Sequence, residues 1–460
     1  MRRAALAASA LVGVAGVAAA LVMGWSDTEV RAPAPSDAPP MATAGHDSGI
    51  DVVLVIGCTV RRDQTEPYGA PPGVTPFLAE LAAQGAAFDD GLAAAPWTKA
   101  AAIALLTGRH AVGLGMVEPG DSRNERILPD EVPTLAERLS DAGYVTVGGT
   151  HNPNLDPIYG LHRGFDTYLP TDGRIRDVAP RGQDLVDAAL EAMDEARQPG
   201  SPTFLQLVLV DAHTPRTPSP AERAAVPHEG VPEQVATYRA TLRRLDDALA
   251  RLDDGLRVRG MTPENTLFVF VADHGEGLAW PPHHGDGHGF HLGPSVTSIP
   301  WILRGPGVPE GTRMAGLASQ VDLVPTLFGL LGLPPVGDAG LAGVDLSGTV
   351  RGELGSTPRK RAYIDTRFYD TNRAAQVNRR FHCQADFDSE GGRRRIPLTT
   401  GCFDRSADPE HARPVQSRVQ LSSLAQWRTD QQRAAQRFSP ANATVPAPLA
   451  ALLEALGYAE

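Results

Sequence analysis

The feature that most constrains the fold is an apolar run, residues 266–272, that stops abruptly at an acid, a histidine and a glycine. Runs of this length, rich in Val and Phe and bounded by turn residues, are typical of buried strands in a parallel sheet. Ligands of open α/β sheets bind outside the carboxyl ends of the strands, so Asp273 and His274 are expected where chemistry occurs. A carboxylate beside an imidazole also suits a divalent metal, although a strand entering a polar turn would look the same.

A second apolar run, residues 51–56, ends at Gly57-Cys58-Thr59 in the same way. Further strands are expected at 144–147, 203–210 and 301–303. Segments with helical spacing of apolar residues alternate with these strands, at 75–84, 100–107, 132–142, 183–197 and 235–256. Strands that alternate with helices predict an α/β fold with a doubly wound, mainly parallel sheet.

The pattern changes after about Gly355. Three short runs have the character of hairpin strands, at 362–366, 375–381 and 396–403. A polar surface helix is expected at 421–438. We therefore expect a large catalytic domain at 49–355 and a smaller C-terminal α+β subdomain at 356–460, with a short antiparallel sheet.

The amino-terminal segment, residues 1–25, begins Met-Arg-Arg and continues as an uncharged stretch. As a helix, residues 4–25 would be roughly 33 Å long at ~1.5 Å per residue, enough to span a bilayer core. It is either a cleaved signal peptide or an uncleaved membrane anchor, and the long apolar region favours the anchor. Both alternatives place the rest of the chain outside the cytoplasm, secreted or periplasmic if the segment is cleaved. Residues 26–48, rich in Pro and Ala, read as a flexible linker.

Composition limits the partners. A net charge of −12 argues against a broad nucleic-acid surface, which needs clustered Lys and Arg. The chain has three cysteines, and in an oxidising compartment Cys383 and Cys402 could pair, which leaves Cys58 as the odd thiol. The oligomeric state cannot be read from the sequence.

Four loops stand at expected strand ends or helix starts: Cys58-Thr59, Trp97-Thr98-Lys99, 211–215 and 273–276. Together with their order, they resemble the sulfatase family of the alkaline-phosphatase superfamily. Other segments that match are 60–63, 68–69, 75–78, 105–109, 164–166, 304–307, 322–327 and 456–458. The resemblance implies an alkaline-phosphatase-like fold and metal-assisted transfer of a sulfuryl or phosphoryl group from a small anionic ester.

The resemblance also implies roles for residues. Asp273 and His274 would hold one divalent metal ion, and Thr98 occupies the position of the nucleophile. His213 and His288 match positions that contact the anion or protonate the leaving oxygen. Three further histidines of the same Gly/Pro-rich loop either bind metal or are solvated: His283, His284 and His291.

Three departures from the family pattern affect the site. The segment 98–102 lacks the Pro and Arg of the formylglycine signal, so Thr98 would act without that modification. The first-loop metal-binding Asp of the family aligns with Cys58, whose thiolate would favour zinc over calcium, magnesium or manganese, unless the ligand is simply lost. The sulfate-holding Arg aligns with Ala102, and Lys99 either replaces its charge or is a solvated side chain.

We therefore expect a membrane-anchored, extracytoplasmic, metal-dependent hydrolase or transferase of sulfate or phosphate esters. The absence of the formylglycine signal favours phosphate esters slightly over sulfate esters. The alternative is a catalytically inert binding protein with a degenerate site on the same scaffold, because all three departures fall in the site.

Overall fold

The computed structural model describes most of the chain after residue 48. The described residues are 49–117, 126–170, 181–280, 286–338, 340–368, 371–387, 400–409, 411–415 and 417–455. The predicted anchor (1–25) and linker (26–48) lie outside them. Within these ranges, no helix is both long and apolar enough to cross a membrane.

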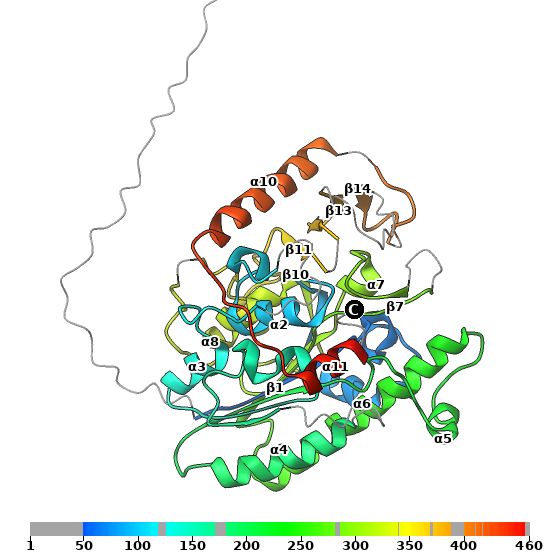
Figure 1. Ribbon diagram of the computed structural model, residues 1–460. Coiled ribbons are helices and arrows are strands. Elements are labelled where there is room, and N and C mark those ends of the chain that lie inside the picture. The colour runs from blue at the N-terminus through cyan, green and yellow to red at the C-terminus, as the bar shows by residue number, and fades with distance from the viewer. Residues whose placement is uncertain are drawn as a thin grey trace, which may run out of the picture. The chain divides into compact units, whose positions relative to one another are not determined.

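The described residues form an eight-stranded sheet in the order β10-β2-β9-β6-β1-β5-β3-β4 (Figure 1). Its strands are β1 (Asp51–Gly57), β2 (Ala86–Leu92), β3 (Val145–Thr150), β4 (Thr167–Leu169), β5 (Thr203–Leu209), β6 (Thr266–Ala272), β9 (Trp301–Arg304) and β10 (Thr312–Ser319). All neighbouring strands pair in parallel except at β9, which is antiparallel to both β2 and β6. The predicted mainly parallel sheet is confirmed.

Helices cover the sheet, as its two buried faces require. The helices are α1 (Pro76–Ala83), α2 (Thr98–Thr107), α3 (Leu135–Asp141), α4 (Gly182–Ala196), α5 (Pro220–Ala224), α6 (Glu233–Val258), α7 (Pro294–Thr297), α8 (Leu323–Leu330), α9 (Ser347–Val350), α10 (Arg418–Ala435) and α11 (Ala447–Ala455). In Figure 1, α4 and α6 lie together along one side of the sheet, and α2 and α8 lie on the other. The five predicted helices of the large domain are present, with ends shifted by up to three residues.

The central strands explain where the site forms. β1, β5 and β6 are buried along their whole length, so apolar side chains on both faces hold them in the core. β1 pairs with β6 in a register that puts Gly57 opposite Ala272. The two strands therefore end side by side, and the residues that follow them, Cys58 and Asp273, are brought together.

A four-stranded antiparallel sheet follows within the described residues, in the order β11-β12-β13-β14. Its strands are β11 (Ala362–Thr366), β12 (Arg373–Val377), β13 (Phe381–Asp386) and β14 (Gly401–Asp404). A further two-stranded sheet joins β7 (Gly277–Leu278) to β8 (Asp286–Gly287). The predicted small C-terminal sheet is thus confirmed, and α10 corresponds to the predicted polar helix.

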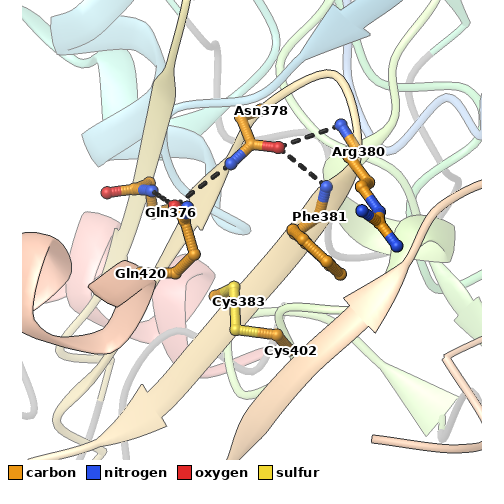
Figure 2. The surroundings of a disulfide bond; sticks show 7 residues. All are labelled: Gln376, Asn378, Arg380, Phe381, Cys383, Cys402 and Gln420. Carbon is orange, nitrogen blue, oxygen red and sulfur yellow. Dashed lines mark hydrogen bonds between the residues drawn. A yellow bond between two sulfur atoms is a disulfide. The ribbon is translucent and has the colours of Figure 1, made fainter. Parts of the chain in front are cut away.

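One predicted strand of this sheet was placed wrongly. The run 375–381 covers the end of β12, a turn and the start of β13. Asn378 makes the turn, because its side-chain oxygen accepts hydrogen bonds from the backbone N–H groups of Arg380 (2.9 Å) and Phe381 (2.8 Å; Figure 2). Of the predicted run 396–403, residues 396–399 lie outside the described residues, and β14 begins at Gly401.

Cys383 and Cys402 form a disulfide between directly opposite residues of β13 and β14 (Figure 2). Cys58 is a free, buried thiol. The cysteines therefore divide as the sequence allowed, with one cross-link in the small sheet and one thiol at the end of the central strand.

Candidate active site

The end of β1, the end of β6 and the start of α2 meet at the carboxyl edge of the sheet. Cys58 follows β1, Asp273 and His274 follow β6, and Thr98 is the first residue of α2. All four side chains are buried, with at most 1% of the residue exposed. The structure thus brings together four of the predicted site residues.

Three of these residues form a cluster that could hold a metal ion. One ligand atom each from Cys58, Asp273 and His274 lies within 4.8 Å of the other two. Oδ1 of Asp273 accepts hydrogen bonds from the backbone N–H of Thr59 (2.8 Å) and of His274 (2.6 Å). Oδ2 is buried and has no hydrogen-bond partner within the described part of the chain. A buried carboxylate oxygen without a donor is the kind of atom that a cation satisfies.

The imidazole of His274 is oriented for the same purpose. Its Nδ1 lies 2.8 Å from the carbonyl oxygen of Gly275, so Nδ1–H donates there and the Nε2 lone pair faces the cluster. This is the usual arrangement of a metal-binding histidine. Burial lowers the pKa of His274, which keeps the ring in the neutral form that binds metals.

The thiol of Cys58 completes the donor set. Burial, and then the negative charge of Asp273, raise the pKa of Cys58 well above its usual value. A cation in the cluster would be needed to favour the thiolate. Sulfur, nitrogen and oxygen donors fit zinc and fit calcium or magnesium poorly, so the residues present fit a zinc ion.

Thr98 lies against this cluster. Its Oγ1 is 3.4 Å from Nε2 of His274 and 3.6 Å from Sγ of Cys58. Because Thr98 begins α2, the amino end of that helix adds partial positive charge beside the hydroxyl. A hydroxyl in this place can approach an anionic ester that is drawn to the same charge.

Asn152, which the sequence analysis missed, also contacts Thr98. It lies just beyond β3, and its Nδ2 donates to Thr98 Oγ1 (3.4 Å) and to Cys58 Sγ (3.4 Å). Its Oδ1 accepts from the backbone N–H of Asn154 (3.0 Å) and from its side chain (3.2 Å). The carboxamide is therefore fixed with its N–H groups aimed at the cluster. The polar segment 150–154 after a predicted strand was the signal that could have revealed it.

Thr59 has an unusual backbone conformation next to the cluster. Its φ is 58°, in the left-handed region, which is uncommon for a β-branched residue. The hydroxyl of Tyr238 donates to its carbonyl oxygen (2.6 Å), and its own N–H is directed at Asp273. Strain of this kind collects at functional sites, where the surroundings hold it in place.

Two further predicted residues, His213 and His288, join His274 in a histidine cluster. The ring centroids of His274 and His288 are 4.6 Å apart, and those of His213 and His288 are 5.2 Å apart. Burial, and then the nearby ring of His288, lower the pKa of His213 to about 3. His213 is therefore neutral at neutral pH. Its Nδ1–H donates to the carbonyl oxygen of Thr214 (2.5 Å), so Nε2 remains as a hydrogen-bond acceptor.

Glu276 and Arg216 support this histidine cluster, and both were missed from the sequence. One carboxylate oxygen of Glu276 lies 3.2 Å from Nδ1 of His288, and the other forms an ion pair with Arg216. Burial alone would raise the pKa of Glu276, but His288 and Arg216 lower it overall, so the carboxylate is charged. The three residues form one polar network at the edge of the site, in which Glu276 is buried and Arg216 and His288 are half-buried.

Lys99 is the second residue of α2 and its side chain is buried beside Tyr159. It is 1% exposed, so the alternative of a solvated side chain is wrong. Its Nζ lies 3.4 Å from the ring centroid of Tyr159, in a cation–π contact. His291 is half-buried, with Nε2 3.2 Å from the carbonyl oxygen of Asp286. His283 and His284 lie outside the described residues.

Relatives named as sulfatases match much of the chain. N-acetylgalactosamine-6-sulfatase of Sus scrofa is 28% identical over 326 residues, which cover 61% of this chain and 62% of the relative. Arylsulfatase A of Homo sapiens is 27% identical over 414 residues, 78% of this chain and 77% of the relative. The chain thus spans less than two thirds of the length of the pig relative.

Solved structures share the fold. A protein crystallised with its substrate D-glucosamine-2-N,6-O-disulfate has a TM-score of 0.68 at 16% identity, covering 85% of this chain and 99% of that one. The protein Ps i-CgsB in complex with a neocarrahexaose has a TM-score of 0.66 at 18% identity, covering 84% and 94%. The family model described as Sulfatase matches residues 50–333, more than half of the sequence, and the chain therefore belongs to the sulfatase family.

Proposed function

We propose that the protein is a metal-dependent hydrolase of sulfate esters in which Thr98 is the nucleophile. The observation that carries the proposal is the position of the Thr98 hydroxyl, 3.4 Å from His274 and 3.6 Å from Cys58 at the buried carboxyl edge of the sheet. Membership of the sulfatase family supports the reaction class.

Cys58, Asp273 and His274 would hold one zinc ion. Such an ion, when bound, lowers the pKa of a neighbouring hydroxyl and neutralises charge on the ester oxygens. The chain itself positions the hydroxyl through Asn152 and excludes water by burying every member of the cluster.

In this proposal the hydroxyl of Thr98 gives its proton to water and its oxygen attacks sulfur. The bond from sulfur to the alcohol oxygen breaks, and that oxygen takes a proton from Nε2 of His288, which acts in its protonated form. Glu276 accepts the hydrogen bond from Nδ1 of His288, which leaves Nε2 for the substrate. His213, whose ring centroid lies 5.2 Å from that of His288, contacts the substrate as a hydrogen-bond acceptor through Nε2, and Lys99, the second residue of α2, supplies positive charge. Water or an acceptor alcohol then cleaves the ester on Thr98, as a threonine nucleophile without formylglycine requires.

Sulfated sugars are the first substrates to test, because the pig relative is named for a sulfated N-acetylgalactosamine and a structural neighbour binds a disulfated glucosamine. Phosphate esters are the second, since a threonine can also accept a phosphoryl group. The disulfide supports an extracytoplasmic location, as disulfides persist in oxidising compartments. We also propose residues 49–355 as the catalytic domain and 356–460 as the smaller subdomain.

One observation favours a second candidate, an inert binding protein. The positions that depart from the family pattern, Cys58, Thr98 and Ala102, all lie in or beside the cluster, whereas the sheet is intact. A retained scaffold with an altered site would produce this distribution.

The deciding experiment measures metal content by mass spectrometry, and turnover of 4-nitrophenyl sulfate and 4-nitrophenyl phosphate, for the wild type and two variants. Thr98→Ala removes the proposed nucleophile. Thr107→Ala makes the same change at the other end of α2, where the side chain is equally buried. We expect about one zinc per chain in all three, and a loss of turnover of at least about a thousandfold in Thr98→Ala alone.

Two results would contradict the proposal. Full turnover in Thr98→Ala would exclude Thr98 as the nucleophile. Failure of the wild type to take up zinc would exclude the proposed metal site. Bound zinc without turnover of any sulfate or phosphate ester would establish the binding protein instead.

A further inference from the structure

A cavity of about 520 Å³ lies between the 3₁₀ helix η3 (Ala111–Leu114) and the carboxyl end of α10. None of its lining residues, all of them in the described part of the chain, belongs to the candidate active site. Its lining includes apolar residues such as Val112 and Phe438. The polar lining residues are Arg126, Arg367, Gln432, Gln436 and Ser439. Its size is in the usual range for a small-molecule pocket.

Two guanidinium nitrogens of Arg367 have no hydrogen-bond acceptor among the described residues. Only 8% of the residue is exposed. Its Nη1 donates to the carbonyl oxygen of Val117 at 3.4 Å, and its Nε is 3.9 Å from Asp365, beyond hydrogen-bond distance. Nε and Nη2 are buried without a hydrogen-bond partner anywhere in the described ranges. Buried guanidinium N–H groups normally have acceptors, and the described residues around the cavity supply none for these two nitrogens of Arg367.

The charge around the cavity favours an anion. Arg126, Arg367 and Arg428 bring three positive charges, and Asp365, which pairs with Arg428 at 3.2 Å, brings one negative charge. The carboxyl end of α10 adds roughly half a negative charge. The balance among these groups remains positive, and none of the described lining residues is acidic. A planar guanidinium whose Nε and Nη2 both lack an acceptor in the described residues is suited to bind an oxyanion through paired hydrogen bonds.

We propose that this cavity is a second binding site, which takes an oxyanion (a sulfate, phosphate or carboxylate group) on Arg367 with Arg126 beside it. The site is coupled to the active site through a short stretch of chain. Phe368 packs against Trp97, with ring centroids 5.4 Å apart, and Trp97 precedes Thr98. The hydroxyl of Thr366 donates to the carbonyl oxygen of Gly289, next to His288. Arg367 lies between these two contacts in the sequence.

The test is a calorimetric titration of the full-length protein with inorganic sulfate, at constant ionic strength set with chloride. We expect the wild type to show a saturable event that Arg367→Gln weakens at least about tenfold, since a hydrogen bond to a charged group is lost. Arg437→Gln is the matched control, because Arg437 is exposed near the end of α10 but does not line the cavity. It removes the same charge and should leave binding unchanged.

A second variant guards against misfolding of Arg367→Gln, whose side chain is buried. Gln436→Glu places a carboxylate on the exposed rim of the cavity without disturbing Asp365, and should also weaken sulfate binding. Wild-type affinity in both Arg367→Gln and Gln436→Glu would overturn the proposal. So would an equal loss in Arg437→Gln, or no sulfate binding by the wild type, which would leave the cavity to water.

The source of the oxyanion is decided by kinetics, and this arm alone rests on the proposed function. If the group belongs to an extended substrate, Arg367→Gln should raise KM for D-glucosamine-2-N,6-O-disulfate at least about tenfold and leave KM for 4-nitrophenyl sulfate unchanged. If the ligand is a free anion, both KM values should stay the same while sulfate binding is lost. Should the protein turn over neither ester, the titration still tests the site.

Discussion

The side-chain nitrogen of Asn152 lies 3.4 Å from the hydroxyl oxygen of Thr98 and donates a hydrogen bond to it. The same nitrogen reaches Sγ of Cys58 at 3.4 Å, and Asn154 fixes the other end of the carboxamide. One amide thus sets the distance between the proposed nucleophile and a proposed metal ligand. In the proposed mechanism Asn152 positions Thr98, for a sulfate or a phosphate ester alike.

Replacing Asn152 with Ala should lower kcat about tenfold to a hundredfold, the usual effect of losing a partner that orients a site, with a smaller change in KM. Asn154→Ala should cost less, because its backbone N–H still holds Oδ1 of Asn152. Steady-state kinetics on an aryl sulfate checks this order. If Asn154→Ala is the more damaging change, the carboxamide of Asn152 does not position the nucleophile.

The donor set predicts that Cys58 determines the metal. Cys58→Asp replaces the sulfur of the cluster with oxygen, which zinc prefers less and which calcium and magnesium prefer more. We expect the variant to lose most of its zinc and to gain affinity for calcium or magnesium, as measured by mass spectrometry after dialysis against each ion. Cys383→Ser with Cys402→Ser is the control, because that pair lies in the small sheet. Unchanged zinc in Cys58→Asp would exclude the thiol as a ligand.

Glu276 should stabilise the fold through its charge. Its pKa is lowered in the folded chain by His288 and Arg216 against the effect of burial, so its stabilisation is present above the unfolded value of about 4.3 and is lost as the pH falls below it. Glu276→Gln should therefore lower the free energy of unfolding by about 3 kcal/mol near pH 7, since it breaks a buried ion pair.

Urea denaturation of the wild type and Glu276→Gln, at about pH 7 and about pH 3, measures this effect. The difference between them should be smaller at the acidic pH. Glu310→Gln, an exposed residue, is the control and should change little at either pH. A difference that grows on acidification would mean that the Glu276 carboxylate is not held in its charged form.

The core of the site could be predicted because a parallel sheet aligns the ends of its strands. Cys58 and Asp273 follow apolar runs of similar length, and the register of β1 with β6 places them together. The same argument did not identify Asn152. Gly148 and Gly149 interrupt the apolar run of β3, so the predicted strand ended before the observed one. A Cβ at Gly148 would come within 2.9 Å of Phe165, so packing requires glycine in that strand.

Contacts between distant segments account for the rest. Arg216 and Glu276 pair across 60 residues of sequence, and neither has a local pattern that identifies its partner. The strands β2 and β10 were missed because exposed and half-buried polar residues, including Asp89 and Arg313, interrupt their apolar pattern. These segments become strands through pairing with a neighbouring strand, and the local sequence pattern does not identify that neighbour.

Asp246, on α6, joins that helix to α1. Its carboxylate accepts hydrogen bonds from the backbone N–H groups of Phe77 (2.8 Å) and Leu78 (2.9 Å), which the first turn of α1 leaves unpaired. Burial raises the pKa of Asp246 to about 7. The pKa in the folded chain exceeds the unfolded value of about 3.9. The protonated carboxyl therefore contributes its full stabilisation at pH values below about 3.9. It is then lost as the pH rises to about 7, by about 1.4 kcal/mol per pH unit.

Asp246→Asn keeps one acceptor and cannot ionise, so its urea midpoint should change less between about pH 5 and pH 7 than that of the wild type. Asp247→Asn, at the neighbouring exposed residue, is the matched control and should follow the wild type. If Asp246→Asn shows the full pH dependence of the wild type, another group is responsible and Asp246 acts only as a helix cap.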